Sequence, residues 1–518
     1  MPRRERESAE QEPRLPTFVS LTVIESIERL KKEGKKIVHC HGVFDVLHPG
    51  HVDHLREAKT LGDILVVSVT ADRFVNKGPG RPIFSVDLRL KMLDALACVD
   101  FTFESPSPTA EDAIDAVKPD FFVKGPDYCN LDTDITGNIR RELDAVEVAG
   151  GQLAFTAGPA MSSSQLINQR GLVNSNHAQA WLEDFRQEFP NDTIPSWLQK
   201  IRELKVLVVG ELILDDYVFC DALGKTSKEP VLAFLKGSYE RQMGGSLAVA
   251  KHCKGLGAQI TLLTRLGNDA AGREAQASIE TEGLRLVSQT SDDHRTIVKT
   301  RYLDEATGTK VFETYAMTDA PPGTSEDEAF AQLLSEEMMA ADLVLVADYG
   351  HGLMTDRVVE SLSNSPGVVA VNTQSNAGNR GFNSISRYPR LDIVSLNGGE
   401  LALELRSKDV DILNILPKLG EKTGAQWIVV TEGAKGMALW SRGFPVSEMP
   451  AFTERVKDRV GAGDALFAAV SLLLAAGAPA PVVGLLGNLA GAAMVSDLGN
   501  RYALSAIDLQ RHAEALLK

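Results

Sequence analysis

The order of hydrophobic and polar residues predicts two successive regions that mix strands and helices. From Lys35 to about Gln169, short apolar runs such as KKIVHCHG, DILVVSVTAD and PDFFVKG alternate with helical stretches such as HVDHLREAKTLG. A second series starts at LKVLVVGELILDDY and continues through ADLVLVADYG and AQWIVVTEGAKGMALW, again with helices between the strands. Strands that alternate with helices usually form a parallel sheet covered by helices. We therefore predict an α/β fold with two domains.

The same pattern divides the chain into four segments. We expect a disordered or flexible N-terminal segment (1–34), a first α/β domain (35–170), a helical linker without strand signal (171–199) and a second, larger α/β domain (200–518). Within the second domain, TIVKTRYLDEATGTKVFETYAM alternates and turns at ATGT, which is typical of a β-hairpin. We expect this hairpin to form a lid beside the main sheet.

Composition limits the possible partners. The net charge of −16 and the isoelectric point near 5.2 disfavour nucleic acid and anionic membranes as partners, because an acidic surface repels phosphate. Five cysteines without a CxxC pair are typical of a reducing compartment. The basic residues in MPRRERESAEQEPRLP have no apolar run behind them, so they do not indicate a signal peptide. We expect a cytoplasmic protein.

One long apolar stretch needs a separate interpretation. The chain has no charged residue from Ala465 to Ser496, which is long enough to span a bilayer. Gly477, Pro479 and Pro481 interrupt this stretch, and proline breaks a helix. Two buried helices of a large α/β domain are therefore expected.

The segment HCHGVFDVLHPGHVDHL, residues 39–55, contains five of the ten histidines. Steps of three residues drift around a helix, and the Glu of a HExxH zinc site is absent, so a metal site is disfavoured. A strand, a small-residue turn and HPGH at a helix start instead predict an anion site, because a helix N-terminus offers free N–H groups. We expect Gly50 to admit a phosphate, with His48 and His51 donating hydrogen bonds to it.

The neighbouring polar residues have simpler interpretations. His39 and His41 alternate onto one face of the strand, where they can be packed as scaffold, and His54 is expected on the helix surface. Two roles are equally expected for Asp45. It is either a nucleotide contact or a carboxylate that stabilises the turn.

GVFDVLHPGH resembles the GxFDxxHxGH signature of the cytidylyltransferase-like nucleotidyltransferases, which attack the α-phosphate of a nucleoside triphosphate and release pyrophosphate. NKGPGRP (with Lys77 and Arg81), DLRLKMLDAL, FFVKGPDY and MSSSQLI resemble further family stretches in the same order. The resemblance covers about residues 35–170, is closest to the heptose-1-phosphate adenylyltransferase group and implies a Rossmann-like domain. It implies catalytic roles for His48, His51 and Lys124, and nucleotide contacts for Gly42, Phe44, Asp45, Gly50, Arg89, Asp127, Ser162, Ser163 and Ser164.

Near the C-terminus, DRVGAGDALFAAV places Gly461, Ala462 and Gly463 before an apolar helix. Three small residues leave a helix N-terminus open to an anion, and the carboxylate of Asp464 is placed to take a proton from a hydroxyl group. Taken alone, a glycine and an Asp cap before a helix are also ordinary structure.

The chain from about residue 200 to residue 516 resembles the ribokinase/PfkB family of sugar kinases. GELILDDY, RQMGGSLAVA, LNGGE, VTEGAKG and LLGNLAGAA match its motifs in order. The resemblance implies that Asp464 is the general base and that Mg²⁺ bridges the phosphates of ATP. It implies sugar contacts for Asp215, Gly244 and Gly245, ATP contacts for Asn397, Glu400, Thr431, Gly433, Gly436, Gly461, Ala462, Gly463 and Asn488, and an indirect Mg²⁺ contact for Glu400.

Two departures from the kinase pattern affect the choice of sugar. Heptose kinases commonly have GGAANVA where this chain has GGSLAVA, so Ala248 replaces an Asn that would bind the sugar. They also have DPK where this chain has NTQ, residues 372–374. A site that lacks a hydrogen bond discriminates differently among sugars.

Together the two resemblances imply a bifunctional enzyme of nucleotide-sugar synthesis, similar to the heptose 7-phosphate kinase/heptose 1-phosphate adenylyltransferase family but with reversed domain order. It would phosphorylate a sugar phosphate with ATP and transfer a nucleotidyl group, from ATP, to a sugar 1-phosphate, giving an ADP-heptose-like product. A homodimer or higher homo-oligomer is expected. The alternative, motivated by Ala248 and Asn372, is a CTP and polyol phosphate transferase fused to a non-catalytic, sugar-kinase-like sensing or dimerisation domain.

Overall fold

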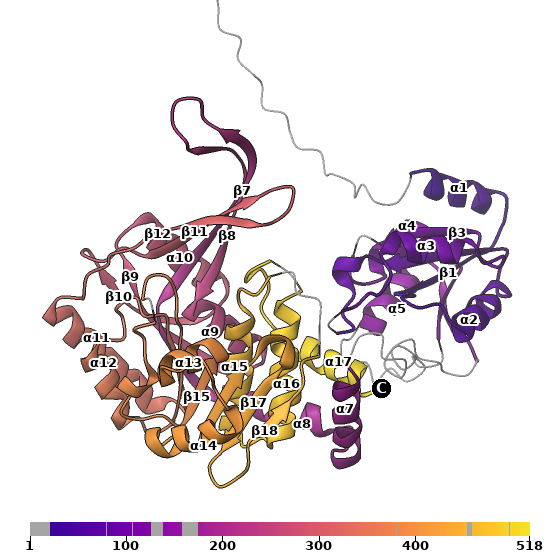
Figure 1. Ribbon diagram of the computed structural model, residues 1–518. Helices are drawn as coiled ribbons and strands as arrows, with labels where there is room; N and C mark the ends of the chain where they lie inside the picture. Colours follow the sequence, from indigo (N-terminus) through magenta and orange to yellow (C-terminus); the bar gives the residue numbers. More distant parts are fainter. Residues whose placement is uncertain are drawn as a thin grey trace, which may run out of the picture. The chain divides into compact units, whose positions relative to one another are not determined.

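The computed structural model describes most of the chain, in two compact units. The described residues are 21–78, 80–105, 107–125, 138–157, 175–379, 381–452, 458–496 and 498–518. The units are Met1–Leu172 and Val173–Leu517, and Figure 1 shows the helices and strands of each. Both units are α/β, which confirms the predicted fold class.

The first unit contains a five-stranded parallel sheet in the order β3-β2-β1-β4-β5. The chain order reverses between β1 and β4, and in such sheets ligands bind beyond the carboxyl ends of the strands at this switch point. The strands are β1 (Ile37–Gly42), β2 (Ile64–Thr70), β3 (Phe101–Ser105), β4 (Phe121–Lys124) and β5 (Gln152–Phe155), and the helices are α1 (Leu21–Lys32), α2 (Pro49–Lys59), η1 (Asp72–Phe74), α3 (Val86–Asp94), α4 (Glu111–Val117) and α5 (Asn138–Val148).

The segment 1–34, expected to be disordered, contains a packed helix. Helix α1 covers Leu21–Lys32, and its Ile27 is buried in a cluster with Ile37, Val66 and Phe103. Val23, Ile24, Ile27 and Leu30 recur at helical spacing and form one apolar face, which explains why this segment folds. The prediction of disorder is corrected for these residues, while residues 1–20 lie outside the described part.

The second unit contains a nine-stranded sheet in the order β10-β9-β6-β13-β14-β15-β16-β17-β18. Successive residues of a strand point to opposite faces, so Val206 and Val208 of β6 lie in one core while Leu207 and Val209 lie in the other. The strands are β6 (Lys205–Gly210), β9 (Gln259–Gly267), β10 (Arg285–Ser291), β13 (Leu343–Asp348), β14 (Val368–Thr373), β15 (Ile393–Asn397), β16 (Trp427–Thr431), β17 (Met437–Ser441) and β18 (Ser447–Met449).

Helices cover both faces of this sheet. The mainly apolar α15 and α16 belong to one core, together with α9, whereas α11, α12 and α14 belong to the other. The helices are α9 (Ser246–Gly255), α10 (Ala270–Thr281), α11 (Thr324–Glu337), η4 (Met338–Ala340), α12 (Asp356–Ser361), η5 (Leu362–Asn364), η6 (Ile385–Arg387), α13 (Gly398–Leu405), α14 (Ile412–Thr423), η7 (Gly433–Lys435), α15 (Ala462–Ala475), α16 (Ala480–Met494) and α17 (Ala506–Leu517).

The uncharged stretch Ala465–Ser496 forms most of α15 and all of α16, as two packed helices separated near Gly477. Their side chains are buried almost throughout because they face the sheet and each other. Among the described residues, no helix combines the length and apolar character needed to cross a bilayer.

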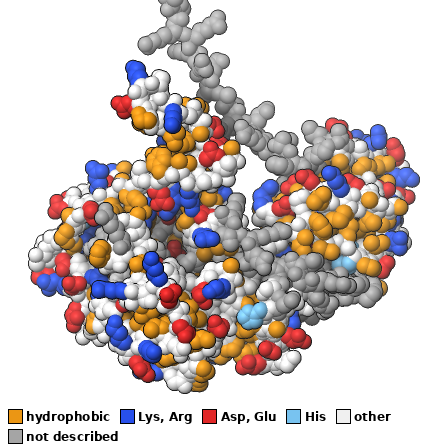
Figure 2. Space-filling view, viewed as in Figure 1, with side chains coloured by type: hydrophobic (Ala, Val, Ile, Leu, Met, Phe, Trp, Pro, Cys, Tyr) orange, Lys and Arg blue, Asp and Glu red, His pale blue; other side chains and the backbone are white. Residues whose placement is uncertain are grey.

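A second sheet of four strands, in the order β12-β11-β7-β8, forms the lid. The predicted hairpin is present as β11 (Ile297–Asp304) and β12 (Lys310–Ala316), which pair antiparallel. The longer hairpin of β7 (Leu212–Lys225) and β8 (Leu232–Gly245) stands away from the body of the unit in Figure 1. Several large hydrophobic side chains on it are exposed: Leu223, Val231, Leu232, Leu235 and Tyr239. Figure 2 shows one face of the molecule with hydrophobic side chains in orange.

The segment 171–199, expected to be a linker, is helical where it is described but does not stand apart. Helices α7 (Asn176–Glu188) and α8 (Thr193–Ile201) bury Leu182, Phe185 and Leu198 in the same core as α15 and α16. The many polar residues of this segment lie on the outer face of the two helices, and its few apolar residues lie on the face that is buried, as in an amphipathic helix. These helices therefore belong to the second unit.

Candidate functional sites

The paired histidines of the first unit lie where β1 leads into α2. His48 is the residue before the helix, in an extended conformation, and His51 lies one turn later. Their rings stack with centroids 3.9 Å apart, and Phe44 meets His51 edge-on at 5.2 Å. Three of their ring nitrogens have no hydrogen-bond partner within the described part of the chain: Nδ1 and Nε2 of His48, and Nδ1 of His51. Buried polar atoms normally have one, so this pair is suited to a polar ligand.

The two histidines are held in the neutral form. Burial lowers the pKa of His48, and the charge of Lys77 adds to this effect. Burial, followed by His48, Lys77 and His54, lowers the pKa of His51 to about 3. A neutral imidazole has one N–H to donate and one nitrogen to accept. His48 can therefore donate to a phosphate oxygen at neutral pH, whereas the ring of His51 also has a hydrogen bond with the backbone of Val46.

The other three histidines have protein partners. His39 Nε2 and His41 Nδ1 both lie 2.8 Å from Ser68 Oγ, which places them on one face of β1 as predicted. His54 differs from its prediction because it is only partly exposed. Its Nδ1 lies 2.9 Å from Thr156 Oγ1, just after β5.

The contacts of Asp45 favour its role in stabilising the turn. Its Oδ1 accepts hydrogen bonds from the backbone N–H groups of Ile83 at 2.6 Å and Phe84 at 3.1 Å. Its Oδ2 lies 3.6 Å from the guanidinium of Arg81, and both side chains are buried. The carboxylate therefore ties the β1–α2 loop to the segment before α3.

Arg89, expected to bind the nucleotide, is instead fully enclosed. Its guanidinium donates to the carbonyls of Phe84 at 3.0 Å, Val43 at 2.5 Å and Thr70 at 2.9 Å, and forms a 2.5 Å ion pair with Asp72. A planar guanidinium can brace several loops in this way. The prediction is corrected: Arg89 supports the loop that carries the histidines and has no surface left for a ligand.

Lys124 ends β4, the strand beside β1, as expected of a residue near the switch point. Its Nζ forms a 2.6 Å ion pair with Glu142 of α5, and both side chains are buried. Sequence reasoning missed Glu142. Any neutralisation of phosphate charge by Lys124 would therefore compete with this carboxylate.

The remaining transferase residues divide into described and undescribed ones. Gly42 ends β1, and a side chain there would start 3.1 Å from the ring of Phe44. Phe44 has φ +51, a left-handed conformation that is uncommon outside glycine, and Gly50 is the second residue of α2. Asp127 and Ser162, Ser163 and Ser164 lie outside the described residues.

In the second unit, Asp464 lies in the first turn of α15. Gly461 precedes the helix with φ +84, and a Cβ there would lie 1.9 Å from Asn500 Oδ1, so only glycine is accommodated. A Cβ at Gly463 would meet nothing within 4 Å, and Ala462 is partly exposed. The helix N-terminus is therefore open to an anion.

The carboxylate of Asp464 is buried and hydrogen-bonded. Its Oδ1 accepts from the hydroxyl of Tyr349 at 2.9 Å and from Nε2 of Gln374 at 3.0 Å. Burial raises its pKa to about 7. The charge of Asp215 also raises it, while the two hydrogen bonds and Lys299 lower it. A general base works best with a pKa near the working pH, so this carboxylate is suited to accept a proton.

The expected sugar contacts lie at the base of the lid. Asp215 of β7 forms a buried 2.5 Å ion pair with Arg301 of β11, a partner that sequence reasoning missed. A Cβ at Gly244 would lie 2.1 Å from Asp215 Oδ2. Gly245 has φ +62, and its Cβ would meet the carbonyl of Glu211 at 2.3 Å. The glycine pair therefore allows β8 to approach β7 and Asp215 closely.

Asn397 and Glu400 form a capping box at the start of α13. Asn397 Oδ1 accepts the N–H of Glu400 at 2.9 Å, and Glu400 Oε2 accepts the N–H of Asn397 at 2.8 Å. Glu400 Oε1 also accepts the N–H of Ser375 at 3.2 Å. Both oxygens are therefore engaged, and only their remaining lone pairs fit a Mg²⁺ contact through water. In the described ranges, no three His, Cys, Asp or Glu residues gather as a metal site.

The other expected ATP contacts lie at neighbouring strand ends. Thr431 ends β16 and is the register partner of Asn397 at the end of β15. Gly433 and Gly436 have φ +61 and +104, and a Cβ at Gly436 would lie 2.0 Å from the carbonyl of Met449. Asn488 is buried in α16, with Nδ2 3.5 Å from that same carbonyl. Its amide therefore contacts the β18 segment.

The two sequence departures have different surroundings. Ala248 is buried in α9 and offers no polar atom. The amide of Asn372 donates to the carbonyl of Ser395 at 2.8 Å, whereas Gln374 contacts the base. Tyr349 and Gln374 follow the carboxyl ends of β13 and β14, where parallel sheets bind ligands. That rule is the signal by which the sequence could have identified them.

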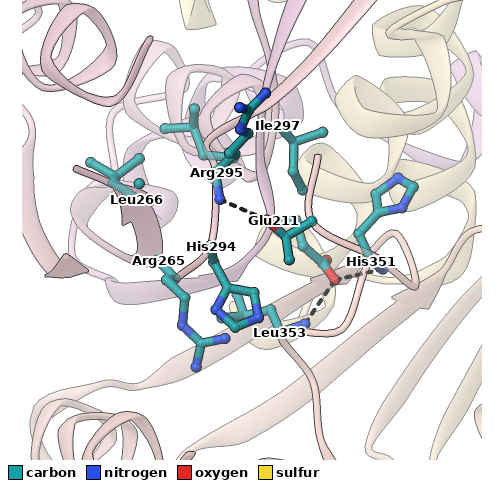
Figure 3. A pocket seen from close by; sticks show the side chains of 11 residues that line it. Glu211, Arg265, Leu266, His294, Arg295, Ile297, His351 and Leu353 are labelled. Atoms are coloured by element: carbon teal, nitrogen blue, oxygen red, sulfur yellow. Dashed lines mark hydrogen bonds between the residues drawn. The ribbon is translucent and has the colours of Figure 1, made fainter. Parts of the chain in front are cut away.

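A buried carboxylate holds the segment that carries Tyr349. Glu211 accepts hydrogen bonds from the backbone N–H groups of Tyr349 at 3.0 Å, His351 at 3.0 Å and Leu353 at 3.4 Å. Figure 3 shows the last two contacts, in a pocket also lined by Arg265 and His294. Burial, followed by the charge of Asp348, raises the pKa of Glu211 to about 7.

Comparison with protein families agrees with this geometry. The sequence model of the pfkB family carbohydrate kinases matches residues 203–507, more than half of the chain. The chain belongs to this family. In this pfkB family member, residues 39–169 also match the cytidylyltransferase-like model. The two matches place the transferase-like region before the kinase region. The comparisons do not show that this order is reversed, so the expectation of a reversed domain order is corrected.

Relatives of this pfkB family member share part of its length. The "Bifunctional protein HldE" of Pseudomonas syringae pv. tomato is 45% identical over 147 residues, which are 28% of this chain and 30% of the relative. The protein of the same name from Pseudomonas savastanoi pv. phaseolicola is 46% identical over 105 residues, 20% of this chain and 22% of the relative. Each match spans less than a third of the relative's length.

Solved structures share the kinase fold. Phosphofructokinase-2 from Escherichia coli, in complex with potassium, has a TM-score of 0.50 and 18% identity, and the match covers 61% of this chain and 99% of that one. The tetrameric inhibited form of the same enzyme has a TM-score of 0.50, 17% identity and coverages of 61% and 100%. At this identity the likeness shows the fold alone.

Proposed function

We propose that the chain is a bifunctional enzyme of nucleotide-sugar synthesis. The second unit phosphorylates a sugar phosphate of the heptose 7-phosphate type with ATP. The first unit transfers a nucleotidyl group from ATP to a sugar 1-phosphate and releases pyrophosphate, giving an ADP-heptose-like product. The names of the partial relatives support the pairing of the two activities.

The observation that carries the kinase proposal is the position of Asp464. Its carboxylate is buried beside an open helix N-terminus, with a pKa raised to about 7. In the reaction it accepts the proton of the sugar hydroxyl, while the N–H groups at the start of α15 face the charge of the transferred phosphoryl group. Mg²⁺ comes with ATP as part of the substrate and neutralises its phosphates.

The transferase proposal depends on the stacked pair His48 and His51. Their buried ring nitrogens without partners in the described part of the chain, at the start of α2, fit the oxygens of a triphosphate. Lys124, at the end of the neighbouring strand, supplies a cation for which the phosphates compete with Glu142. The cytoplasmic location and the homo-oligomeric state stay predictions.

A second candidate function keeps only the transferase active, with CTP and a polyol phosphate, and uses the kinase fold for sensing or dimerisation. The observation that favours it is Ala248, whose buried methyl group cannot hydrogen-bond a sugar. The raised pKa of Asp464 and the open space at Gly463 beside it favour the bifunctional enzyme instead.

One experiment with reciprocal variants tests both units in the full chain. Pyrophosphate release is measured with ATP or CTP and with sugar 1-phosphates or glycerol phosphate, and ADP formation is measured with a panel of sugar phosphates. We expect His51→Ala to lower pyrophosphate release by about 100-fold or more and to leave ADP formation intact. We expect Asp464→Asn to lower ADP formation by about 100-fold or more and to leave pyrophosphate release intact.

His54→Gln is the matched control in the first unit, because Gln can keep a hydrogen bond to Thr156. It should retain pyrophosphate release. A preference for CTP with glycerol phosphate would contradict the heptose proposal. Absence of ADP formation with every sugar phosphate, in the wild type as in Asp464→Asn, would contradict the kinase proposal and support the second candidate.

A further inference from the structure

The two hydrogen bonds to Asp464 reach the same oxygen. Tyr349 and Gln374, from the ends of two different strands, both donate to Oδ1, at 2.9 Å and 3.0 Å. No hydrogen bond within the described part of the chain reaches Oδ2. A carboxylate held by two donors on one oxygen cannot rotate freely, and its second oxygen keeps its lone pairs.

We propose that Tyr349 and Gln374 are positioning residues that fix Asp464 so that Oδ2 is the oxygen that accepts the proton. The inference rests on the proposed kinase function and adds to it roles for Tyr349 and for Gln374, which lies where the chain departs from the DPK pattern. In the reaction, the sugar hydroxyl oxygen forms a bond to the γ-phosphorus of ATP as its O–H bond breaks. The proton passes to Oδ2, and the P–O bond to ADP breaks with its electron pair leaving on ADP.

The donors themselves are held by the surrounding structure. Glu211, between β6 and β7, accepts the backbone N–H of Tyr349 and that of His351, so the segment after β13 is tied to that junction. The side chain of Tyr349 is buried, and Lys299 lies 6.0 Å from its ring centroid. A rigid donor fixes an acceptor better than a mobile one, because little entropy is lost when the hydrogen bond forms.

The charges that face Asp464 come from two further elements, β7 and β11. Asp215 of β7 raises the pKa of Asp464, while Lys299 of β11 lowers it, as do the hydrogen bonds from Tyr349 and Gln374. Both hydrogen bonds favour the ionised carboxylate. Removing either donor therefore raises the pKa of the base and leaves the neighbouring charges in place.

The test compares Tyr349→Phe and Gln374→Leu with a matched control, Tyr388→Phe. Tyr388 is also a buried tyrosine that donates to a buried carboxylate, Asp348, at 2.6 Å, but it does not contact the base. The dependence of kcat/KM on pH is measured for ADP formation in the full chain. We expect the acid limb of Tyr349→Phe and of Gln374→Leu to move up by about one pH unit each, which lowers kcat/KM about 10-fold at pH 6.

High pH separates positioning from mere damage to the fold. At pH 9 the base is ionised again, so kcat/KM of both variants should return to within about 3-fold of the wild type. Tyr388→Phe should keep the wild-type midpoint. An unchanged midpoint in both Tyr349→Phe and Gln374→Leu, or a loss that pH 9 does not restore, would overturn the proposal.

A second measurement needs no substrate, so that it separates failure of this proposal from failure of the kinase function. A carboxyl group with a raised pKa keeps its proton in the folded state where the unfolded chain has lost it, so stability falls as pH rises. The melting temperature of wild type relative to Asp464→Asn should fall from about pH 4 to about pH 7. With Tyr349→Phe present in both proteins, this fall should continue to about pH 8. An end point still at pH 7 would overturn the role of Tyr349, whether or not any sugar is phosphorylated.

Discussion

Single buried charges in this protein have opposite roles that depend on their partners. Arg89 is fully enclosed and donates to three backbone carbonyls, so it serves the fold. Asp464 is also buried, but one of its oxygens has no protein donor among the described residues. A buried charged side chain whose donors or acceptors are all used by the protein therefore stabilises the fold, whereas one that keeps an unused acceptor can take part in the reaction.

Replacing Arg89 should destabilise the first unit strongly. Arg89→Met leaves the carbonyls of Val43 and Thr70 buried without donors, which should cost about 3 kcal/mol. Hydrogen exchange in peptides from β1 and β2 should become about 100-fold faster, since 1.4 kcal/mol is a factor of ten.

Arg73→Met is the matched control for Arg89→Met. The side chain of Arg73 is 53% exposed and lies 3.7 Å from Glu104, so the change should alter stability by less than about 0.5 kcal/mol. Equal exchange rates in Arg89→Met and Arg73→Met would show that the enclosed guanidinium is not a brace.

At the scale of elements, helix starts account for most of the predicted phosphate contacts. Helix α2 begins beside His48, α15 beside Gly461, and α13 at the capping box of Asn397 and Glu400. Only the first two have unpaired polar groups or open space at the start among the described residues. The capping box provides hydrogen-bond partners within the protein for the start of α13. Glu400 therefore stabilises this helix whether or not it also contributes to ligand binding.

Glu400→Ala should therefore lower the stability of the second unit. Loss of the capping box and of the Ser375 contact should cost about 1 to 2 kcal/mol. Urea unfolding followed by tryptophan fluorescence reports this unit, because Trp181, Trp197, Trp427 and Trp440 all lie in it. Glu421→Ala, at an exposed position of α14, should change stability by less than about 0.5 kcal/mol. A midpoint of Glu400→Ala that equals that of Glu421→Ala would contradict the structural role.

At the scale of the whole molecule, each unit has cores of its own. Two large clusters lie within the second unit and three smaller ones within the first. The second unit also includes α7 and α8, which lie before the start of the family match at residue 203. The packing of α7 and α8 therefore places the N-terminal boundary of the folded kinase unit before residue 203.

Two shortened chains test this limit. The chain 175–518 should melt cooperatively, whereas 203–518 should melt at a lower temperature or aggregate, because it lacks the apolar side chains of α7 and α8 that fill the core. Each such side chain contributes roughly 1.5 to 3 kcal/mol when buried. The measurement is thermal unfolding by circular dichroism. Identical melting of the two chains would mean that α7 and α8 are a linker, as the sequence had indicated.

Sequence patterns predicted the features that depend on near neighbours along the chain. Alternating strands and helices, the lid hairpin, the histidine pair and Asp464 at a helix start all follow from residues within a few positions of one another. The disorder expected for residues 21–32, the separate linker and the nucleotide role of Arg89 did not hold. In each case an apolar face or a guanidinium found its partners in distant segments.

The sequence by itself determined the two α/β regions, their order and the positions of His48, His51 and Asp464, because periodicity and helix starts are local properties. Only the tertiary structure decided which groups surround those residues. Tyr349 and Gln374 lie 115 and 90 positions from Asp464, and Arg301 lies 86 positions from Asp215. Hydrogen bonds over such separations arise from the packing of whole elements, and the protonation state and orientation of each reactive group depend on them.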